Sequence, residues 1–357
     1  MDISVLQPSS FVWYADISLD VQKFILGYFF RYLLLLSVLT YLLKNMGFYM
    51  KRFIYLFLII FVLAFLLVNC NRRNSTAPDE EIPDSVRIDV PAFGSDNSLE
   101  IVTWNVENFP KLGSQTVDDI AEIVTELDAD IYGMEEIADT TSFRQLINKL
   151  DGYAGTYSSD QYGPGNYQKT AVLYKKNIVS ISNKEMLFTN DDYIFPRPPL
   201  KVYVTAQKGA EVFDFTFIVL HLKAYGDAES EARRRSACVK LKSYLDGELV
   251  TSADKDYVVV GDWNDELTDP PADNVFKVFL DDPTDYRFLT LDLPSGDYTY
   301  IGGSFRSNID QILITADAEV EYDSGTTSVI KIDQYFNAYV NEVSDHRPVG
   351  SVFPVFQ

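Results

Sequence analysis

Short apolar segments that stop at a polar residue recur along the C-terminal part of the chain, and this pattern limits the possible folds more than any other feature. The clearest case is residues 257–260, Tyr-Val-Val-Val, which are followed by Gly261, Asp262, Trp263 and Asn264. A short apolar run of this kind predicts a strand that is buried on both faces. Side chains that follow such a strand are held by its backbone and exposed by the loop, which suits catalysis, although Gly, Asp and Asn also end many strands as ordinary turns.

Further strands and a few helices are predicted between residues 98 and 357. Apolar residues alternate or run together, as strands require, in 99–104, 130–134, 170–174, 202–206, 212–220, 298–301 and 309–314, and again after residue 348. Apolar residues recur at helical spacing in 117–127, 141–150 and 227–249. Because the strands are many and their apolar runs are short, we expect an α/β fold of the α+β type, with sheets packed face to face and helices outside.

Side chains that bind metals or transfer protons lie directly after several of these strands, at Asn105, Glu136, His221, Asp262 and Asn264. The chain has only 2 histidines, His221 and His346. An isolated histidine is more often structural than catalytic. Here each one lies beside another candidate residue, which favours a catalytic role for both.

The charge of the chain excludes one way of binding nucleic acid. With 30 basic and 52 acidic residues the net charge is −22, so a basic stripe cannot supply the affinity. The charge does not exclude an enzyme that binds phosphates through a divalent metal ion. The 2 cysteines, Cys70 and Cys238, lie in different contexts and predict no disulfide framework; Cys238 is expected to be a small buried residue of a helix.

The N-terminal segment indicates export and membrane attachment. Residues 24–43 are apolar apart from Arg31 and long enough to span a bilayer. Met50, Lys51 and Arg52 then precede an apolar run that ends at Asn69 and Cys70. This order is typical of a bacterial lipoprotein signal with lipidation at Cys70, although Asn69 replaces the small residue usual there.

The sequence therefore predicts four parts. Residues 1–49 are an upstream extension or an extra membrane segment, and residues 50–70 are the lipoprotein-type signal, with an uncleaved membrane anchor as the alternative. Residues 71–97, rich in polar residues and breakers, are expected to be a flexible tether. Residues 98–357 are the globular domain, held in the cell envelope outside the cytoplasm.

Several short motifs of this domain occur in an order that supports a family resemblance. They are Trp104-Asn105, Met134-Glu135-Glu136-Ile137, His221-Leu222-Lys223-Ala224, Gly261-Asp262-Trp263-Asn264, Ile309-Asp310-Gln311-Ile312 and Ser344-Asp345-His346. Together they resemble the endonuclease/exonuclease/phosphatase superfamily, the deoxyribonuclease I-like metal-dependent phosphodiesterases. The resemblance covers about residues 98–357 and implies a four-layer α/β sandwich of two mixed sheets flanked by helices.

The resemblance also implies a metal site. Glu136 is similar to the principal Mg²⁺ ligand, and Asn105 to the residue beside the metal and the scissile phosphate. Asp345 is similar to a further acid of the metal site, and Glu107 to a weaker second ligand. Mn²⁺ and Ca²⁺ are the alternative ions. Glu135 stands where Gln is usual and is expected to add negative charge beside the site.

The remaining roles concern the phosphate. Asp262 and Asn264 resemble the pair that orients the nucleophile or leaving group and holds the phosphate. His346 resembles the family's histidine that is paired with an acid, here Asp310. His221 matches a second histidine that faces the phosphate in the deoxyribonuclease and sphingomyelinase branches. For Arg197, in a Pro-rich segment, the resemblance implies a substrate-side position, and a surface arginine is the alternative.

These residues suit hydrolysis of a phosphodiester, because a hard cation offsets the charge that repels the attacking hydroxide. His346, Asp310 and Asp262 can share the proton transfers. We therefore predict a Mg²⁺-dependent phosphodiester hydrolase, an extracytoplasmic nuclease acting on nucleic acid. The alternative is a phospholipid- or inositol-phosphate-directed enzyme of the same fold, similar to sphingomyelinases. A non-catalytic binding protein and a carbohydrate-active enzyme fit the two histidines less well, and no protein partner is predicted.

Overall fold

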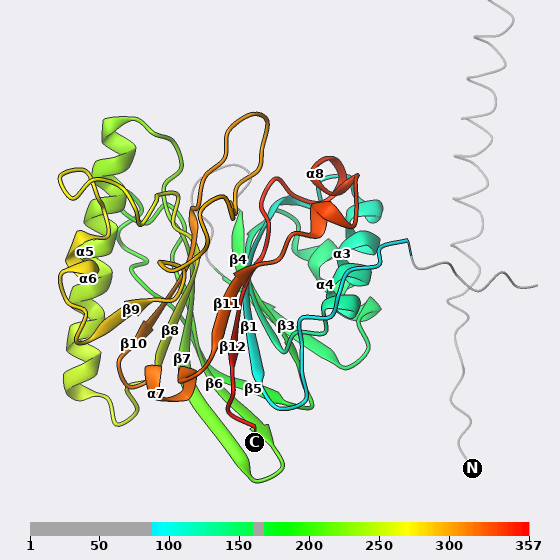
Figure 1. Ribbon diagram of the computed structural model, residues 1–357, viewed down its shortest axis with the longest axis horizontal. Helices are drawn as coiled ribbons and strands as arrows, with labels where there is room; N and C mark the ends of the chain where they lie inside the picture. The colour runs from blue at the N-terminus through cyan, green and yellow to red at the C-terminus, as the bar shows by residue number, and fades with distance from the viewer. Residues whose placement is uncertain (1–86, 160–167, 357) are drawn as a thin grey trace, which may run out of the picture. The chain divides into compact units, whose positions relative to one another are not determined.

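The computed structural model describes residues 87–159 and 168–356, which form two six-stranded sheets with helices outside them (Figure 1). The predicted upstream segment, the signal with Cys70, and residues 71–86 of the predicted tether lie outside the described residues. Within the described part of the chain, no helix has the length and apolar character needed to cross a membrane.

The first sheet has the strand order β11-β12-β1-β2-β4-β3. Only β1 and β2 run parallel in it; the other neighbours are antiparallel. Its strands are β1 (Leu99–Phe109), β2 (Ile131–Ile137), β3 (Tyr153–Tyr157), β4 (Lys169–Lys175), β11 (Thr326–Val329) and β12 (Val349–Phe353).

The second sheet has the strand order β5-β6-β7-β8-β10-β9, and only β7 and β8 run parallel. Its strands are β5 (Val179–Met186), β6 (Leu200–Lys208), β7 (Glu211–His221), β8 (Tyr257–Asp262), β9 (Tyr286–Phe288) and β10 (Asp310–Thr315). Both sheets are therefore mixed, as the sequence predicts.

Helices cover the outer face of each sheet (Figure 1). The helices α3 (Ser114–Leu127) and α4 (Thr140–Lys149) pack on the first sheet, and α5 (Ala228–Thr251) and α6 (Lys277–Leu280) pack on the second. The remaining helical turns are α7 (Glu319–Tyr322), η1 (Ile332–Gln334) and α8 (Tyr339–Glu342). This arrangement confirms the predicted four-layer sandwich.

Apolar side chains between the sheets hold the layers together. Ile101 and Ile131 of the first sheet pack in one buried cluster with Phe217, Val258 and Val260 of the second. Each of these residues is fully buried, and burying a side chain of this size contributes about 1.5–3 kcal/mol. Residues 217–220 of β7 and 257–260 of β8 are covered on both faces and are apolar without interruption, whereas Phe213 and Phe215 of β7 alternate with more exposed residues.

Local differences from the predicted elements have physical causes. Residues 298–301 do not form a strand: Tyr300 makes only isolated bridges, to Ser307 and to His346. The strand β5 was not predicted, because most of its side chains are exposed and polar. Cys238 is buried in α5, as expected.

Ordered packing begins before residue 98. Ile88 and Val90, which lie in the segment predicted as a tether, are buried in the core with α3. Arg87 also forms ion pairs with Asp119 and Glu342. The end of the predicted tether is therefore part of the folded domain.

Candidate functional site

Strand register brings three of the predicted site residues to one edge of the second sheet. His221 at the end of β7 is the register partner of Asp262 at the end of the parallel strand β8. Asp310 at the start of the antiparallel strand β10 pairs with Asp262 from the other side. All three side chains are buried. Their sequence separation is large, and the sheet alone makes them neighbours.

The strand β8 approaches β7 closely at Gly261. Its φ is 149°, and a Cβ atom at this position would lie 1.9 Å from the carbonyl oxygen of Leu220. A side chain would therefore force the two strands apart. Glycine at this point lets Asp262 reach the same level as His221.

Asn105 of β1 connects the first sheet to this edge. Its Nδ2 donates hydrogen bonds to Asp262 Oδ2 (2.9 Å) and to Glu136 Oε1 (3.3 Å). The backbone oxygen of Asn105 accepts a hydrogen bond from Ser344 Oγ at 2.6 Å. The amide thus ties the predicted metal ligand of one sheet to the predicted catalytic acid of the other.

His346 is held by its side chain and by its backbone. Its Nδ1 lies 2.9 Å from Asp310 Oδ2, and its Nε2 lies 3.9 Å from Asp262 Oδ2 and from Asp345 Oδ1. The Tyr339 hydroxyl donates to the His346 backbone oxygen. Although burial lowers the pKa of His346, the carboxylates of Asp310, Asp262 and Asp345 outweigh it and raise the pKa to about 10. His346 is therefore a cation at neutral pH.

His221 has the opposite character. Its Nε2 lies 3.4 Å from Asp262 Oδ2 and 3.9 Å from Glu136 Oε1. Burial, together with the positive charges of Arg197 and His346, lowers its pKa well below the usual value. One histidine of this site is therefore charged at neutral pH and the other is neutral.

Asp262 contacts Asn105, Asn264 and both histidines. Its Oδ1 accepts a hydrogen bond from the Asn264 backbone N–H at 2.9 Å, and Asn264 Nδ2 donates to Leu222 O at 3.3 Å. Asn264 has a φ of 58°, a left-handed conformation that Asn tolerates better than most residues. Burial raises the pKa of Asp262 to about 7, and the charges of Asp310 and Glu136 act in the same direction. A carboxyl group with this pKa can exchange a proton near neutral pH.

The predicted metal ligands Glu136, Glu107 and Asp345 all line the same cavity as the histidines. Glu136 Oε2 accepts hydrogen bonds from Asn108 N (2.8 Å) and Gln168 Nε2 (2.7 Å). Glu107 Oε2 accepts a hydrogen bond from the Asp345 backbone N–H at 2.8 Å and forms an ion pair with Lys111. Burial raises the pKa of Asp345 to about 6, and the nearby Glu107 contributes to this rise.

The donor set of these residues fits a hard divalent cation. Several carboxylates face one cavity, and hard oxygen ligands are those that Mg²⁺ and Ca²⁺ take. In the described part of the chain, the one group of three potential ligand atoms within 4.8 Å of one another comes from Asp262, Asp310 and His346. In that group His346 Nδ1 and Asp310 Oδ2 already bind each other, so we assign it to proton transfer rather than to a metal ion.

Glu135 differs from the sequence-based expectation. It is fully buried between the sheets, where Thr103 Oγ1 donates to its Oε1 at 3.3 Å. Burial raises its pKa well above the usual value, and Asp310 and Asp262 raise it further. Burial therefore disfavours the negative charge that the sequence predicts for Glu135 beside the site.

Gln168 is a site residue that the sequence did not indicate. Its Nε2 donates to Glu136 Oε2 and, at 2.6 Å, to Asn108 Oδ1, while its Oε1 accepts a hydrogen bond from Arg197 Nη2 at 2.7 Å. Gln168 precedes β4 rather than following a strand, so the strand-end rule could not find it. Arg197 acts through Gln168 and also binds Leu222 O (3.4 Å); among the described residues it does not line the cavity.

The cavity at this edge has a volume of about 830 Å³. Of the predicted site residues it is lined by Glu107, Glu136, His221, Asp262, Asn264, Asp345 and His346. Asn105 and Asp310 lie directly behind this lining, bound to Asp262 and His346. With the exception of Arg197, the predicted residues thus surround one cavity.

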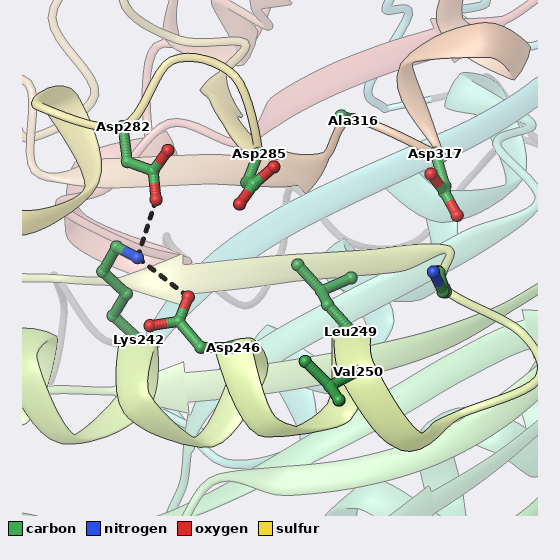
Figure 2. A pocket seen from close by; sticks show the side chains of 9 residues that line it. Lys242, Asp246, Leu249, Val250, Asp282, Asp285, Ala316 and Asp317 are labelled. Carbon is green, nitrogen blue, oxygen red and sulfur yellow. Dashed lines mark hydrogen bonds and ion pairs between the residues drawn. The ribbon is translucent and has the colours of Figure 1, made fainter.

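A second cavity, of about 490 Å³, lies beside α5 and contains none of these residues (Figure 2). Its lysine Lys242 forms ion pairs of 2.8 Å with both Asp246 and Asp282, as the dashed lines in Figure 2 show. The remaining labelled acids are Asp285 and Asp317. We find no histidine or metal-binding group of residues there in the described part of the chain.

Comparison with known proteins agrees with this fold. The Endonuclease/Exonuclease/phosphatase family matches residues 102–346. A family protein from Bacteroides thetaiotaomicron superposes with a TM-score of 0.55 at 17% identity, covering 73% of this chain and 98% of the other. A mannosyl-6-phosphatase from the same organism gives 0.51 at 17% identity, covering 71% and 98%.

A third solved structure, D. rerio TDP2 in complex with a single-strand DNA product, gives a TM-score of 0.53 at 18% identity, covering 72% of this chain and 99% of the other. Curated proteins give no match. The family match extends over more than half of the chain, and its residues include every site residue from Asn105 to His346. The chain therefore belongs to the Endonuclease/Exonuclease/phosphatase family, whose enzymes hydrolyse phosphoester bonds.

Proposed function

We propose that this chain hydrolyses phosphate esters with a divalent cation, and that Mg²⁺ is that cation. The observation that carries the proposal is the convergence of Glu136, Asp262 and His346, from both sheets, on one cavity. Glu136, Asp345 and Glu107 would hold the cation, with Asn105 beside it; Mn²⁺ and Ca²⁺ accept similar oxygen ligands. When bound, such a cation offsets the charge of the phosphate and stabilises the transition state.

The chain's own side chains divide the remaining work. Asp262 accepts a proton from the attacking water, because burial keeps its pKa near 7. His346, positively charged and oriented by Asp310, donates a hydrogen bond to the phosphate. The water oxygen forms a bond to phosphorus while its proton passes to Asp262. The P–O ester bond breaks, the leaving oxygen takes a proton from solvent, and Asp262 then returns its proton to solvent. His221 and Asn264 lie beside Asp262 and orient the phosphate.

Two substrate classes compete within this activity. Nuclease activity is supported by the similar fold of TDP2, which was solved with a single-strand DNA product. A small phosphate ester, such as an inositol phosphate or the headgroup of a phospholipid, is favoured by the acidity of the cavity, whose lining has eight carboxylates. The similar fold of a mannosyl-6-phosphatase also supports the second class.

We further propose that the protein works outside the cytoplasm, attached to the membrane at its N-terminal end through Cys70. This proposal is supported by the sequence of residues 50–70 alone. Labelling cells with a radioactive fatty acid tests it, since Cys70→Ser should abolish incorporation into the chain.

The hydrolase proposal is tested with the purified full-length chain and a panel of plasmid DNA, RNA, sphingomyelin and p-nitrophenyl phosphate, each with Mg²⁺ or with EDTA. Glu136→Ala and His346→Ala should each lower turnover at least about a hundredfold while circular dichroism stays unchanged. Asp285→Asn, in the second cavity, is the matched control. Turnover that persists in EDTA or in Glu136→Ala would contradict the proposal.

A further inference from the structure

The cavity wall beyond the metal and histidine residues is acidic. Besides the predicted site acids, its lining contains Glu231, Asp265, Glu266 and Asp269. Among the described residues that line the cavity, Arg234 is the only arginine or lysine, and it is already bound: its Nε donates to Asp265 Oδ2 at 2.8 Å. In the described part of the chain, the lining of this wall therefore offers no unpaired arginine or lysine to a second phosphate group.

Arg234 also fixes the loop between β7 and α5. Its Nη1 donates to the backbone oxygens of Lys223 (2.9 Å) and Tyr225 (2.7 Å). The side chain of Arg234 is nearly fully buried, so these hydrogen bonds hold the loop from inside the domain. The loop is therefore fixed by a buried side chain, although residues 224–226 of it line the cavity.

Tyr225 is the unusual residue of this loop. Its φ is 83°, a left-handed conformation that an aromatic residue rarely adopts. Its ring lines the cavity, yet the residue is 75% exposed, and the Lys223 ammonium lies 4.2 Å from the ring centroid on one side. Strain of this kind persists where the surroundings impose it, and it often marks a ligand contact. In this loop, Arg234 Nη1 holds the backbone oxygen of Tyr225 itself and that of Lys223 two residues before it.

A second exposed ring belongs to the same lining. Phe305 is 64% exposed. Its ring centroid lies 5.9 Å from that of Tyr300, which in turn lies 5.0 Å from the His346 ring. The cavity thus combines exposed aromatic faces with carboxylates, at a volume typical of small-molecule sites.

These features discriminate between substrates. A polynucleotide would bring further phosphates against the acidic wall, and like charges repel each other. Carboxylates instead accept hydrogen bonds from hydroxyl groups. Covering an exposed aromatic ring with the apolar face of another ring is favourable, because it removes apolar surface from water. A ring that carries hydroxyl groups and one phosphate satisfies all three conditions.

We propose that the substrate is a cyclic polyol carrying a single phosphate, and that Tyr225 is the residue on which its ring packs. This inference rests on the proposed phosphoester hydrolysis. In the reaction, water adds across the P–O ester bond and releases the free polyol and inorganic phosphate. The phosphate lies among Glu136, Asp262 and His346, and the hydroxyl groups face the carboxylates of the acidic wall.

Steady-state kinetics of the full-length chain with Mg²⁺ test the proposal. The probes are glucose 6-phosphate, glycerol 3-phosphate, which has no ring, and a short single-stranded DNA oligonucleotide. Glucose 6-phosphate should have the highest kcat/KM, at least about tenfold above the oligonucleotide. Added NaCl should not slow cleavage of the oligonucleotide, because the salt screens the repulsion between its phosphates and the acidic wall.

Variants at Tyr225 provide the second readout. Tyr225→Ala should raise KM for glucose 6-phosphate about five- to tenfold, with a smaller change in kcat, since a lost ring contact of this kind is worth about one factor of ten or less. The ratio of kcat/KM for glucose 6-phosphate to that for glycerol 3-phosphate should fall in the same variant. Tyr225→Phe should retain both, because the ring is kept. Tyr335→Ala, which removes a 53% exposed ring outside the cavity, is the control.

The outcomes separate two kinds of failure. A higher kcat/KM for the oligonucleotide that falls with salt would overturn the substrate class, and an unchanged KM in Tyr225→Ala would overturn the role of Tyr225. If no ester is hydrolysed, the proposed function itself fails. In that case, calorimetry of glucose 6-phosphate binding to the wild type and to Tyr225→Ala still tests the role of Tyr225. Equal affinities of the two proteins would overturn the inference.

Discussion

Replacing Asp310 with Asn should lower the pKa of His346, because Asp310 is its direct charged partner. The two groups lie 2.9 Å apart and both are buried. Burial alone lowers the pKa of His346, and Asp310 is the largest influence in the opposite direction. Asn keeps the size of the side chain and removes its charge.

The size of the shift follows from the contact. A hydrogen bond to a charged group contributes about 1.5–3 kcal/mol, and 1.36 kcal/mol corresponds to about one pKa unit. The pKa of His346 should therefore fall from about 10 by roughly one to two units in Asp310→Asn. At neutral pH the ring would stay mostly charged, whereas the alkaline limb of activity would move to lower pH.

The measurement benefits from the 2 histidines of the chain. Nitrogen-15 NMR of the imidazole rings gives two sets of signals, which His346→Gln assigns. His221, whose pKa is lowered, titrates on the acidic side and does not interfere. The pH dependence of kcat/KM should show the same displacement of the alkaline limb.

Stability provides an independent check with a defined sign. His346 has a folded-state pKa raised from 6.5 to about 10, so its contribution is complete below about pH 6.5 and is lost as pH rises through about 10. In Asp310→Asn this loss should begin at lower pH, as urea unfolding measures. Asp285→Asn is the control. If the NMR pKa and the alkaline limb both stay unchanged, the Asp310 contact does not set the charge of His346.

Two further predictions concern the metal site. Gln168→Ala removes the 2.7 Å hydrogen bond to Glu136 and should weaken Mg²⁺ binding, measured by calorimetry, about 10- to 100-fold. Gln207→Ala is the control. An unchanged affinity for Mg²⁺ in Gln168→Ala would show that Gln168 does not orient Glu136. Protons compete with the cation for Asp345, whose pKa is raised to about 6, so Mg²⁺ should raise Tm more at about pH 8 than at about pH 5. An equal rise in Tm at both pH values would contradict this competition.

The sequence predicted the strand ends because each combines a buried run with a polar stop. An uninterrupted run of valines, here Val258 to Val260, is typical of a strand buried on both faces, and both faces of this strand are indeed buried. Asp262 follows the run and was therefore predicted at the edge of a sheet. The motif order then predicted that His221, Asp310 and His346 would join it. These inferences needed only local patterns and their order along the chain.

Other features depend on contacts between distant residues, and no local pattern encodes them. Gln168 is defined by Glu136 and Arg197, which lie on other strands and loops. The backbone oxygen of Tyr225 is held by a hydrogen bond from Arg234, which lies in α5. The raised pKa of Glu135 follows from its burial between the sheets, whereas its sequence neighbours indicated only an additional acid.

The hydrogen bond from Asn105 to Asp262 joins side chains of different sheets, and this division has a consequence for folding. A partly folded chain with only one sheet formed contains either the Glu136 ligand or the Asp262 carboxyl, never both in place. Catalytic competence should consequently appear only when the two sheets have docked. If one sheet forms before the other docks on it, recovery of turnover during refolding should lag behind recovery of circular dichroism, which reports the secondary structure of either sheet.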